Sequence, residues 1–397
     1  MLSGEGRIPT APWHEPALNI RLLVFLTVLT HLSFAGCRVI LSLTAIHFEA
    51  SPFVIGVLLS LLTVIPILFA LRWGRWVDRA GVYGPMLAGV AAIFLAMVLG
   101  WAFPRLETLF VVSPLAGSGF FLYHIAAGQA AALIGRPEDR IKNFSLLALA
   151  FSVSSFLGPT LSGFAIDGIG HANAMLALSV GALVNLVVLS VWKPDVPRHG
   201  SAAAHQEKRR VSDLLRIPGF RLVFIVSSVL SMTWDLFAFV MPIHGSQLGL
   251  SATTIGLILG AFGAAVFVVR LLLPLVAHRV DEWRMLITAM LLSGVTLIAF
   301  PLVHGVPLLV ALSFLLGVGL GGTQPFIMAL LYEKAPEGRG AEVLSVRTWL
   351  INVSQTGVPL MFGALGAVLG MLPAFWAMGA SLLVAGWFAT RGIDSKQ

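Results

Sequence analysis

The stretch Gly74-Arg75-Trp76-Val77-Asp78-Arg79-Ala80-Gly81 gathers charge and glycine between two long apolar runs, at residues 53–71 and 83–103. The hydrocarbon core of a bilayer is about 30 Å thick, so a helix rising 1.5 Å per residue needs roughly 20 apolar residues to cross it. Both runs meet this length. We therefore expect the stretch to form a loop at a membrane surface, between two spanning helices.

Apolar runs of this length recur along the chain, which has 397 residues, of which 58% are hydrophobic and only 11% are charged. A soluble globular chain carries about 25% charged residues. We therefore predict an all-α membrane protein with twelve transmembrane helices. The spans are expected at residues 20–46, 53–71, 83–103, 108–134, 143–166, 171–192, 219–244, 253–275, 284–303, 306–332, 343–369 and 373–390.

A long polar stretch separates the sixth and seventh spans, at residues 193–218. Its basic residues and its Ser/Ala/His-rich centre predict a flexible cytoplasmic linker. The chain then divides into six-helix bundles at 20–192 and 219–390, with cytoplasmic tails at 1–19 and 391–397.

The two bundles carry traces of an internal repeat. With a shift of 200 residues, Arg21 falls on Arg221 and Arg79 falls on Arg279. Such a repeat predicts two pseudo-equivalent halves related by an axis along the membrane normal. A substrate site is then expected between them, near the middle of the bilayer.

The basic residues are distributed unequally over the two membrane surfaces. With the N-terminus in the cytoplasm, nearly all of the 25 Lys and Arg residues fall on the cytoplasmic side, and Arg105 falls on the other. This predicts cytoplasmic termini in a bacterial inner membrane. The net charge of +7 resides in these loops, so no nucleic-acid partner is expected.

The stretch quoted first resembles the signature loop of the major facilitator superfamily, in which Gly is followed after three residues by Asp-Arg, one further residue and Gly. Gly74, Asp78, Arg79 and Gly81 match this pattern, whereas Val82 stands where the family has a basic residue. The resemblance implies the fold of two six-helix bundles and a gating role for the four matching residues. A solvated turn without a gating role is the alternative.

The fifth span carries Gly158-Pro159 and Gly163, which resemble the Gly-Pro motif of the family's drug/proton antiporters. Ser154 and Ser113 stand where those antiporters have Gly and Arg. The resemblance implies a functional helix kink and favours export. Ordinary packing of a kinked helix is the alternative.

Two charged residues lie deep inside predicted spans, Arg38 in the first and Asp235 in the seventh. An ionisable group in hydrocarbon is costly unless it faces a partner or a water-filled cavity. These helices line the central cavity in the family, which implies an ion pair across the halves, and Asp235 is the carboxylate expected to carry protons. A purely structural pair, or snorkelling to an interface, is the alternative. Arg270 and Arg347 are expected to snorkel to the cytoplasmic surface, and a functional role is the alternative.

Further cavity residues follow from the resemblance. The first, fourth and tenth helices also line the family's cavity, so His31, His124 and Gln324 are candidate substrate contacts. Trp234 and Phe239 flank Asp235 and would offer an aromatic surface to an apolar ligand. Interhelical hydrogen bonding and core packing are the alternatives.

These features predict a monomeric secondary transporter that works by alternating access and exports a small organic compound in exchange for protons across a lipid bilayer. A proton-linked importer or uniporter, and a transporter-like sensor without flux, are the alternatives. The sequence contains no Gly-Lys-Ser phosphate-binding loop and no metal-ligand spacing, so we expect no cofactor, no metal and no ATP. An enzyme would need clustered catalytic groups, which are missing.

Overall fold

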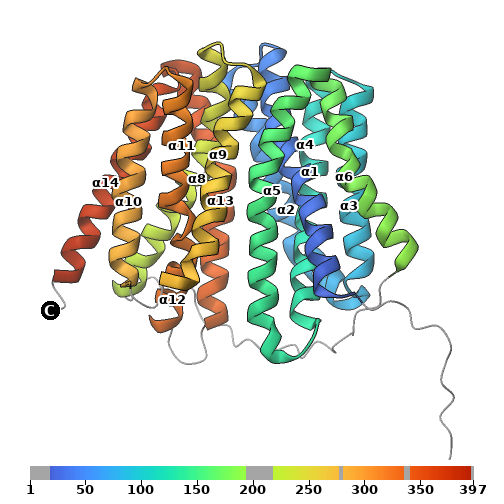
Figure 1. Cartoon of the computed structure of the whole chain (residues 1–397), viewed down its shortest axis with the longest axis horizontal. Coiled ribbons are helices and arrows are strands. Elements are labelled where there is room, and N and C mark those ends of the chain that lie inside the picture. The colour runs from blue at the N-terminus through green and yellow to red at the C-terminus, as the bar shows by residue number, and fades with distance from the viewer. Residues whose placement is uncertain (1–17, 194–217, 277–279, 335–339, 395–397) are drawn as a thin grey trace, which may run out of the picture.

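The computed structural model describes residues 18–193, 218–276, 280–334 and 340–394. The predicted linker falls almost wholly outside these residues, as does most of the predicted N-terminal tail. In Figure 1 the first half of the chain, coloured blue to green, lies beside the second half, coloured yellow to red.

All the long elements of the described residues are helices. Those of the first half are α1 (Ile20–His47), α2 (Pro52–Ala80), α3 (Tyr83–Ala102), α4 (Leu106–Leu133), α5 (Arg140–Ile169) and α6 (His171–Trp192). Those of the second half are α8 (Pro218–Gln247), α9 (Ala252–Val276), α10 (Glu282–Ala299), α11 (Val306–Gly321), α12 (Thr323–Lys334), α13 (Gly340–Leu369) and α14 (Leu372–Asp394). Two short 3₁₀ turns add η1 (Pro137–Asp139) and η3 (Phe300–Leu302).

Twelve segments of these residues are long and apolar enough to cross a membrane. The prediction of an all-α protein with twelve spans is therefore confirmed. The tenth span, Val306–Leu331, differs from a plain helix, because α11 ends at Gly321 and α12 starts at Thr323.

The stretch Gly74–Gly81 is not the loop that we expected. α2 continues to Ala80, so Gly74, Asp78 and Arg79 lie in its last two turns. A helix satisfies its own backbone hydrogen bonds and needs no change of conformation where it leaves an apolar environment. Only Gly81 turns the chain, with a φ of 79° that suits glycine at a helix C-terminus.

The internal repeat is visible in the helix caps. The Ser51 hydroxyl accepts the Val54 N–H at 3.4 Å at the start of α2, and the Ser251 hydroxyl accepts the Thr254 N–H at 3.2 Å at the start of α9. Side-chain caps of this kind satisfy N–H groups that have no partner within the helix. Equivalent residues therefore begin equivalent helices in the two halves.

The repeat extends to packing inside each half. The Ser113 hydroxyl donates to the Leu58 carbonyl, linking α4 to α2, and the Ser313 hydroxyl donates to the Ile258 carbonyl, linking α11 to α9. Ser113, which replaces the arginine of drug antiporters, thus makes an interhelical bond that its counterpart repeats.

The two halves meet along two seams, α5 against α9 and α2 against α13. A Cβ atom on Gly256 of α9 would lie 2.5 Å from the Pro159 carbonyl oxygen of α5. A Cβ atom on Gly56 of α2 would likewise overlap the Pro359 carbonyl oxygen of α13. Glycine lets the helix backbones approach this closely. Each half therefore contributes one glycine and one proline to a pair of matching contacts near the N-terminal ends of α2 and α9.

Candidate functional site

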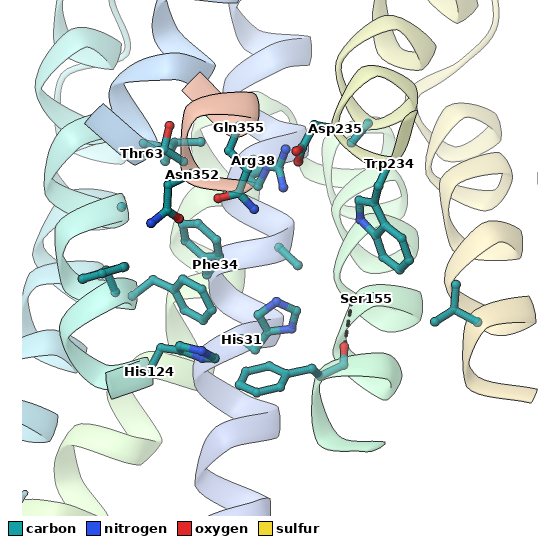
Figure 2. A pocket seen from close by; sticks show the side chains of 18 of the residues that line it. His31, Phe34, Arg38, Thr63, His124, Ser155, Trp234, Asp235, Asn352 and Gln355 are labelled. Carbon is teal, nitrogen blue, oxygen red and sulfur yellow. Dashed lines mark hydrogen bonds between the residues drawn. The ribbon is translucent and has the colours of Figure 1, made fainter. Parts of the chain in front are cut away.

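A cavity of about 810 Å³ lies between the two halves. Its lining residues come from α1, α2, α4 and α5 of the first half and from α8, α9, α12 and α13 of the second half. Figure 2 shows polar and aromatic side chains from both halves facing this space.

Arg38 of α1 and Asp235 of α8 both line the cavity and point toward one another from opposite halves (Figure 2). Asp235 is only 4% exposed, and Arg38 acts electrostatically on its carboxylate. Within the described residues, no nitrogen–oxygen contact of 4.0 Å or less joins them. The structure thus brings the two charges to the same cavity from opposite halves, without a direct ion pair between them.

The two charges break the equivalence of the repeat. Arg38 has Ala238 at the equivalent position of the second half, and Asp235 has Ala35 at the equivalent position of the first. All four residues line the cavity. At these two positions, the first half therefore supplies a positive charge and the second half a negative charge, and the repeat-equivalent residue of the other half is an alanine in each case.

Four of the five predicted substrate contacts line the cavity: His31, His124, Gln324 and Trp234. Phe239 does not. Its side chain is 0% exposed, and the next lining aromatic residue after Trp234 is Phe237. Five positions along a helix correspond to a rotation of about 140°. Phe239 therefore points away from the surface that Trp234 presents to the cavity.

Aromatic rings from α1, α4 and α5 form one wall, which we call the aromatic cluster: His31, Phe34, Phe120, His124 and Phe151. Phe34 and Phe120 stack with their centroids 4.1 Å apart, and the centroid of His31 lies 5.0 Å from that of Phe151. The Nδ1 atom of His31 is buried and has no hydrogen-bond partner. A buried polar atom without a partner is uncommon in a folded protein, so His31 is a polar residue of this wall whose hydrogen-bonding capacity is not used within the protein.

The opposite wall carries a second set of rings. Trp234 of α8 packs edge to face on Phe262 of α9, with centroids 4.6 Å apart, and Phe237 lies 5.3 Å from the same Phe262 ring. All three residues line the cavity. A flat apolar ligand would therefore find aromatic surface on both sides.

Arg270 lines the cavity and does not reach toward the surface as we had expected. Its guanidinium donates to the Ser152 hydroxyl at 2.9 Å and to the Ala148 carbonyl at 3.3 Å. Both partners belong to α5, so Arg270 of α9 links the two halves. The expectation was wrong because it considered only the distance to the helix end and not the polar atoms of a helix in the other half.

Arg347 also departs from the expected snorkelling. It is 7% exposed, and its Nε atom donates to the Ser227 hydroxyl of α8 at 3.2 Å. It does not line the cavity. Its partner lies in the same half, which indicates a role in holding α13 against α8.

Polar groups from the second seam complete the cavity. Thr63, Asn352 and Gln355 line it, and Figure 2 shows them near Arg38. The hydroxyls of Thr63 and Thr356 lie 2.9 Å apart and join α2 to α13. Thr63 escaped the sequence analysis because an isolated threonine in an apolar span carries no distinctive signal.

The residues predicted for the gate and the helix kink make their contacts away from Arg38 and Asp235. The Asp78 carboxylate accepts a bond of 3.5 Å from the Gln129 amide of α4, within the first half. Gly158 packs against α1, and Gly163 packs against the start of α9. Pro159 lies inside α5 and also lines the cavity. The described residues contain no group of three or more His, Cys, Asp or Glu side chains that could hold a metal ion.

Comparison with known proteins identifies the family. A family model for the Major Facilitator Superfamily matches residues 23–287 and again residues 223–396. The chain is 24% identical to the class D tetracycline resistance protein of Salmonella ordonez over 327 residues, which cover 77% of this chain and 78% of that protein. It is 22% identical to a PmrA-like multidrug resistance efflux pump of Lactococcus lactis over 340 residues, 83% of this chain and 82% of that protein.

Solved structures share the fold. A POT family transporter in complex with a thioalcohol-conjugated peptide superposes with a TM-score of 0.77 at 14% identity, over 95% of this chain and 96% of that one. A bacterial homologue of the lysosomal transporter Spinster, in an inward-facing unoccupied conformation, gives 0.74 at 12% identity over 92% and 95%. The family model covers nearly the whole chain, and these relatives are transporters and not enzymes. The chain is therefore a multi-pass membrane protein that belongs to the Major Facilitator Superfamily of transporters.

Proposed function

We propose that this protein is a secondary transporter that exports a small organic compound in exchange for protons, by alternating access of one central cavity. The observation that carries the proposal is the meeting of Arg38 and Asp235, one from each half, in the cavity between two pseudo-equivalent bundles. A relative motion of the halves changes the distance between these charges.

Alternating access is supported by the two seams. The contacts of Gly256 with Pro159 and of Gly56 with Pro359 bring the halves together near the N-terminal ends of α2 and α9. We take this end as extracellular, because the distribution of Lys and Arg predicts cytoplasmic termini and a cytoplasmic linker. Rocking of the halves would open this end and close the other. The residues Gly74, Asp78, Arg79 and Gly81 would then act at the cytoplasmic gate.

Proton coupling rests on Asp235. A protonated carboxyl is neutral and no longer attracts the Arg38 guanidinium, whereas a carboxylate does so strongly where little water screens the charges. Protonation of Asp235 would therefore change the interaction between the halves. This links proton binding to the conformational change, as antiport requires.

Export is favoured by the tetracycline resistance protein and the multidrug efflux pump to which the chain is similar. A proton-linked importer or uniporter would use the same cavity. A sensor without flux would tolerate loss of the cavity charges.

The test uses the full chain reconstituted in liposomes with an imposed pH gradient of either sign. Tetracycline and radiolabelled 2-naphthoate serve as probes. Flux of either probe that runs opposite to the direction of proton flow, reverses with the gradient and is absent from protein-free liposomes supports proton antiport. Flux in the same direction as the protons indicates a proton-linked importer. Flux that ignores the gradient indicates a uniporter, and absence of flux of a probe that binds the same preparation indicates a sensor.

A further inference from the structure

We infer that the cavity selects aromatic compounds that carry a negative charge, such as aromatic carboxylates. This inference rests on the proposed transport function and specifies its substrate. It follows from the balance of charge in the cavity, from one unpartnered histidine nitrogen and from the two aromatic walls.

The charges that line the cavity do not cancel. Arg38 and Arg270 are basic, and Asp235 is the one acidic residue among the described residues that line it. Asp235 faces Arg38 from the opposite half (Figure 2). One carboxylate can balance only one of the two arginines, so the lining keeps an excess positive charge. Arg270, which is partly buried, has no acidic residue near it other than Asp235 among the described lining residues. A ligand anion would supply a counter-ion.

The partners of Arg270 agree with this reading. Its two bonds go to a hydroxyl and a backbone carbonyl, Ser152 and Ala148, which are both uncharged. A guanidinium carries five N–H donors in a plane and binds carboxylates through two parallel bonds. The bonds from Arg270 to α5 hold the guanidinium at the cavity, where it can meet an incoming carboxylate.

His31 adds a second contact for the ligand. It lines the same cavity as Arg38, Arg270 and His124. Its buried Nδ1 atom has no partner. A carboxylate bound by Arg270 in this cavity would bring a hydrogen-bond acceptor to the side of the cavity that His31 lines.

The aromatic side chains on two sides of the cavity indicate that the uncharged part of the ligand is an aromatic ring. The aromatic cluster covers one side of the cavity, and the rings of Trp234, Phe237 and Phe262 cover the other. Aromatic rings bury large areas and favour offset or edge-to-face contact with another ring. A cationic ligand would add a further positive charge near two arginines, and a neutral ligand would leave Arg270 without a counter-ion.

The test compares three ligands that share one ring system: 2-naphthoate, the neutral 2-naphthamide and the cationic 2-naphthylmethylammonium. Binding to the purified full chain in detergent is measured by calorimetry. Because a hydrogen bond to a charged group contributes about 1.5–3 kcal/mol, or roughly ten-fold or more in affinity, naphthoate should bind at least about ten-fold tighter than the amide. The ammonium compound should bind more weakly than both.

Three variants identify the residue responsible. Arg270→Gln should abolish the preference for naphthoate over the amide, and Arg270→Lys, which keeps the charge, should retain much of it. Arg105→Gln removes a positive charge from an exposed site outside the cavity and should change nothing. Thermal unfolding shows which variants remain folded, and the comparison of the three ligands in the wild-type chain does not depend on any variant.

The inference is overturned if the amide or the ammonium compound binds wild-type protein as tightly as naphthoate, if none of the three binds, or if folded Arg270→Gln keeps the full preference. Proposed transport is judged separately, by gradient-driven flux in liposomes. Export of tetracycline together with equal affinity for the three naphthyl compounds would leave the transport function standing and remove only the substrate class.

Discussion

The carboxylate of Asp167, near the end of α5, accepts the backbone N–H of Thr253 at 2.7 Å at the start of α9. Its other oxygen accepts the N–H of Ala252 at 3.2 Å. The first half thus caps a helix of the second half. A carboxylate at a helix N-terminus satisfies unpaired N–H groups and interacts favourably with the helix dipole. This bond lies at the end of the molecule where both seams are closed.

Asp167→Ala should therefore favour opening of this end. A helix cap contributes about 1 kcal/mol, so the closed population should fall roughly five-fold relative to the open one. Spin labels at the exposed positions Arg105 and Gln247, one in each half, would report the change as a larger share of long distances. Asp167→Asn keeps an acceptor oxygen and should give a smaller shift. An unchanged distance distribution in Asp167→Ala would show that the cap does not hold this end closed.

The seam glycines give a second prediction. In Gly256→Ala, the added Cβ would lie 2.5 Å from the Pro159 carbonyl, which is closer than atoms tolerate. Overpacking of this kind costs about 1–3 kcal/mol. We expect a folded protein that cannot close the α5–α9 seam, with slower transport and widened Arg105–Gln247 distances. Gly357→Ala is the matched control, because nothing lies within 4 Å of its added Cβ. Equal transport by the two variants would contradict this role of the seam.

A third prediction concerns coupling. Asp235→Asn should abolish flux driven by a pH gradient while leaving the protein folded, because the amide cannot carry the proton. Glu107→Gln neutralises an exposed acid at the start of α4 and serves as the control. Gradient-driven flux at the wild-type rate in Asp235→Asn would remove this residue from the coupling mechanism.

The relation of Arg38 to Asp235 can be tested by exchanging their charges. Arg38→Asp and Asp235→Arg should each inactivate transport, since each places two like charges on facing walls. The double variant restores opposite charges and should recover part of the flux in liposomes. Two inactive single variants with no recovery in the double variant would indicate that the residues act separately.

Two aromatic residues of α8 are expected to have different roles, Trp234 in ligand binding and Phe239 in stability. Trp234→Ala should weaken naphthoate binding by about ten-fold, because the side chain lines the cavity and a large aromatic contact is lost. Phe239→Ala should instead lower the midpoint of thermal unfolding, since a fully buried ring costs about 3–5 kcal/mol to remove, and the folded fraction should bind normally. The reverse pattern would mean that Phe239 belongs to the binding surface.

Much of this architecture could be predicted because the membrane imposes strong constraints. The cost of charge in hydrocarbon singled out Arg38 and Asp235, and the spacing of apolar runs located the spans. The prediction of a loop at residues 74–80 was wrong. It relied on the charged residues of this stretch, whereas α2 continues through them to Ala80. The gating role of this stretch stays a prediction.

The residues that were missed depend on contacts between the halves. Arg270 turns inward because Ala148 and Ser152 of α5 offer acceptors, and no pattern within α9 indicates this. Asp167 can be recognised as a cap of α9 only once α5 and α9 are known to lie side by side.

Phe239 was wrongly predicted to line the cavity, because the sequence does not show which side of α8 faces inward.

The alanines that are equivalent to the two charged residues in the repeat have a consequence for how a substrate moves. A cavity formed by two identical halves would bind a molecule equally well in two orientations, which are related by the axis between the halves. Because Arg38 corresponds to Ala238 in the repeat, and Asp235 corresponds to Ala35, the charges of the cavity do not follow the symmetry of its two halves. A polar cargo should therefore adopt a single orientation and keep it throughout its passage, so that the same end always leaves first.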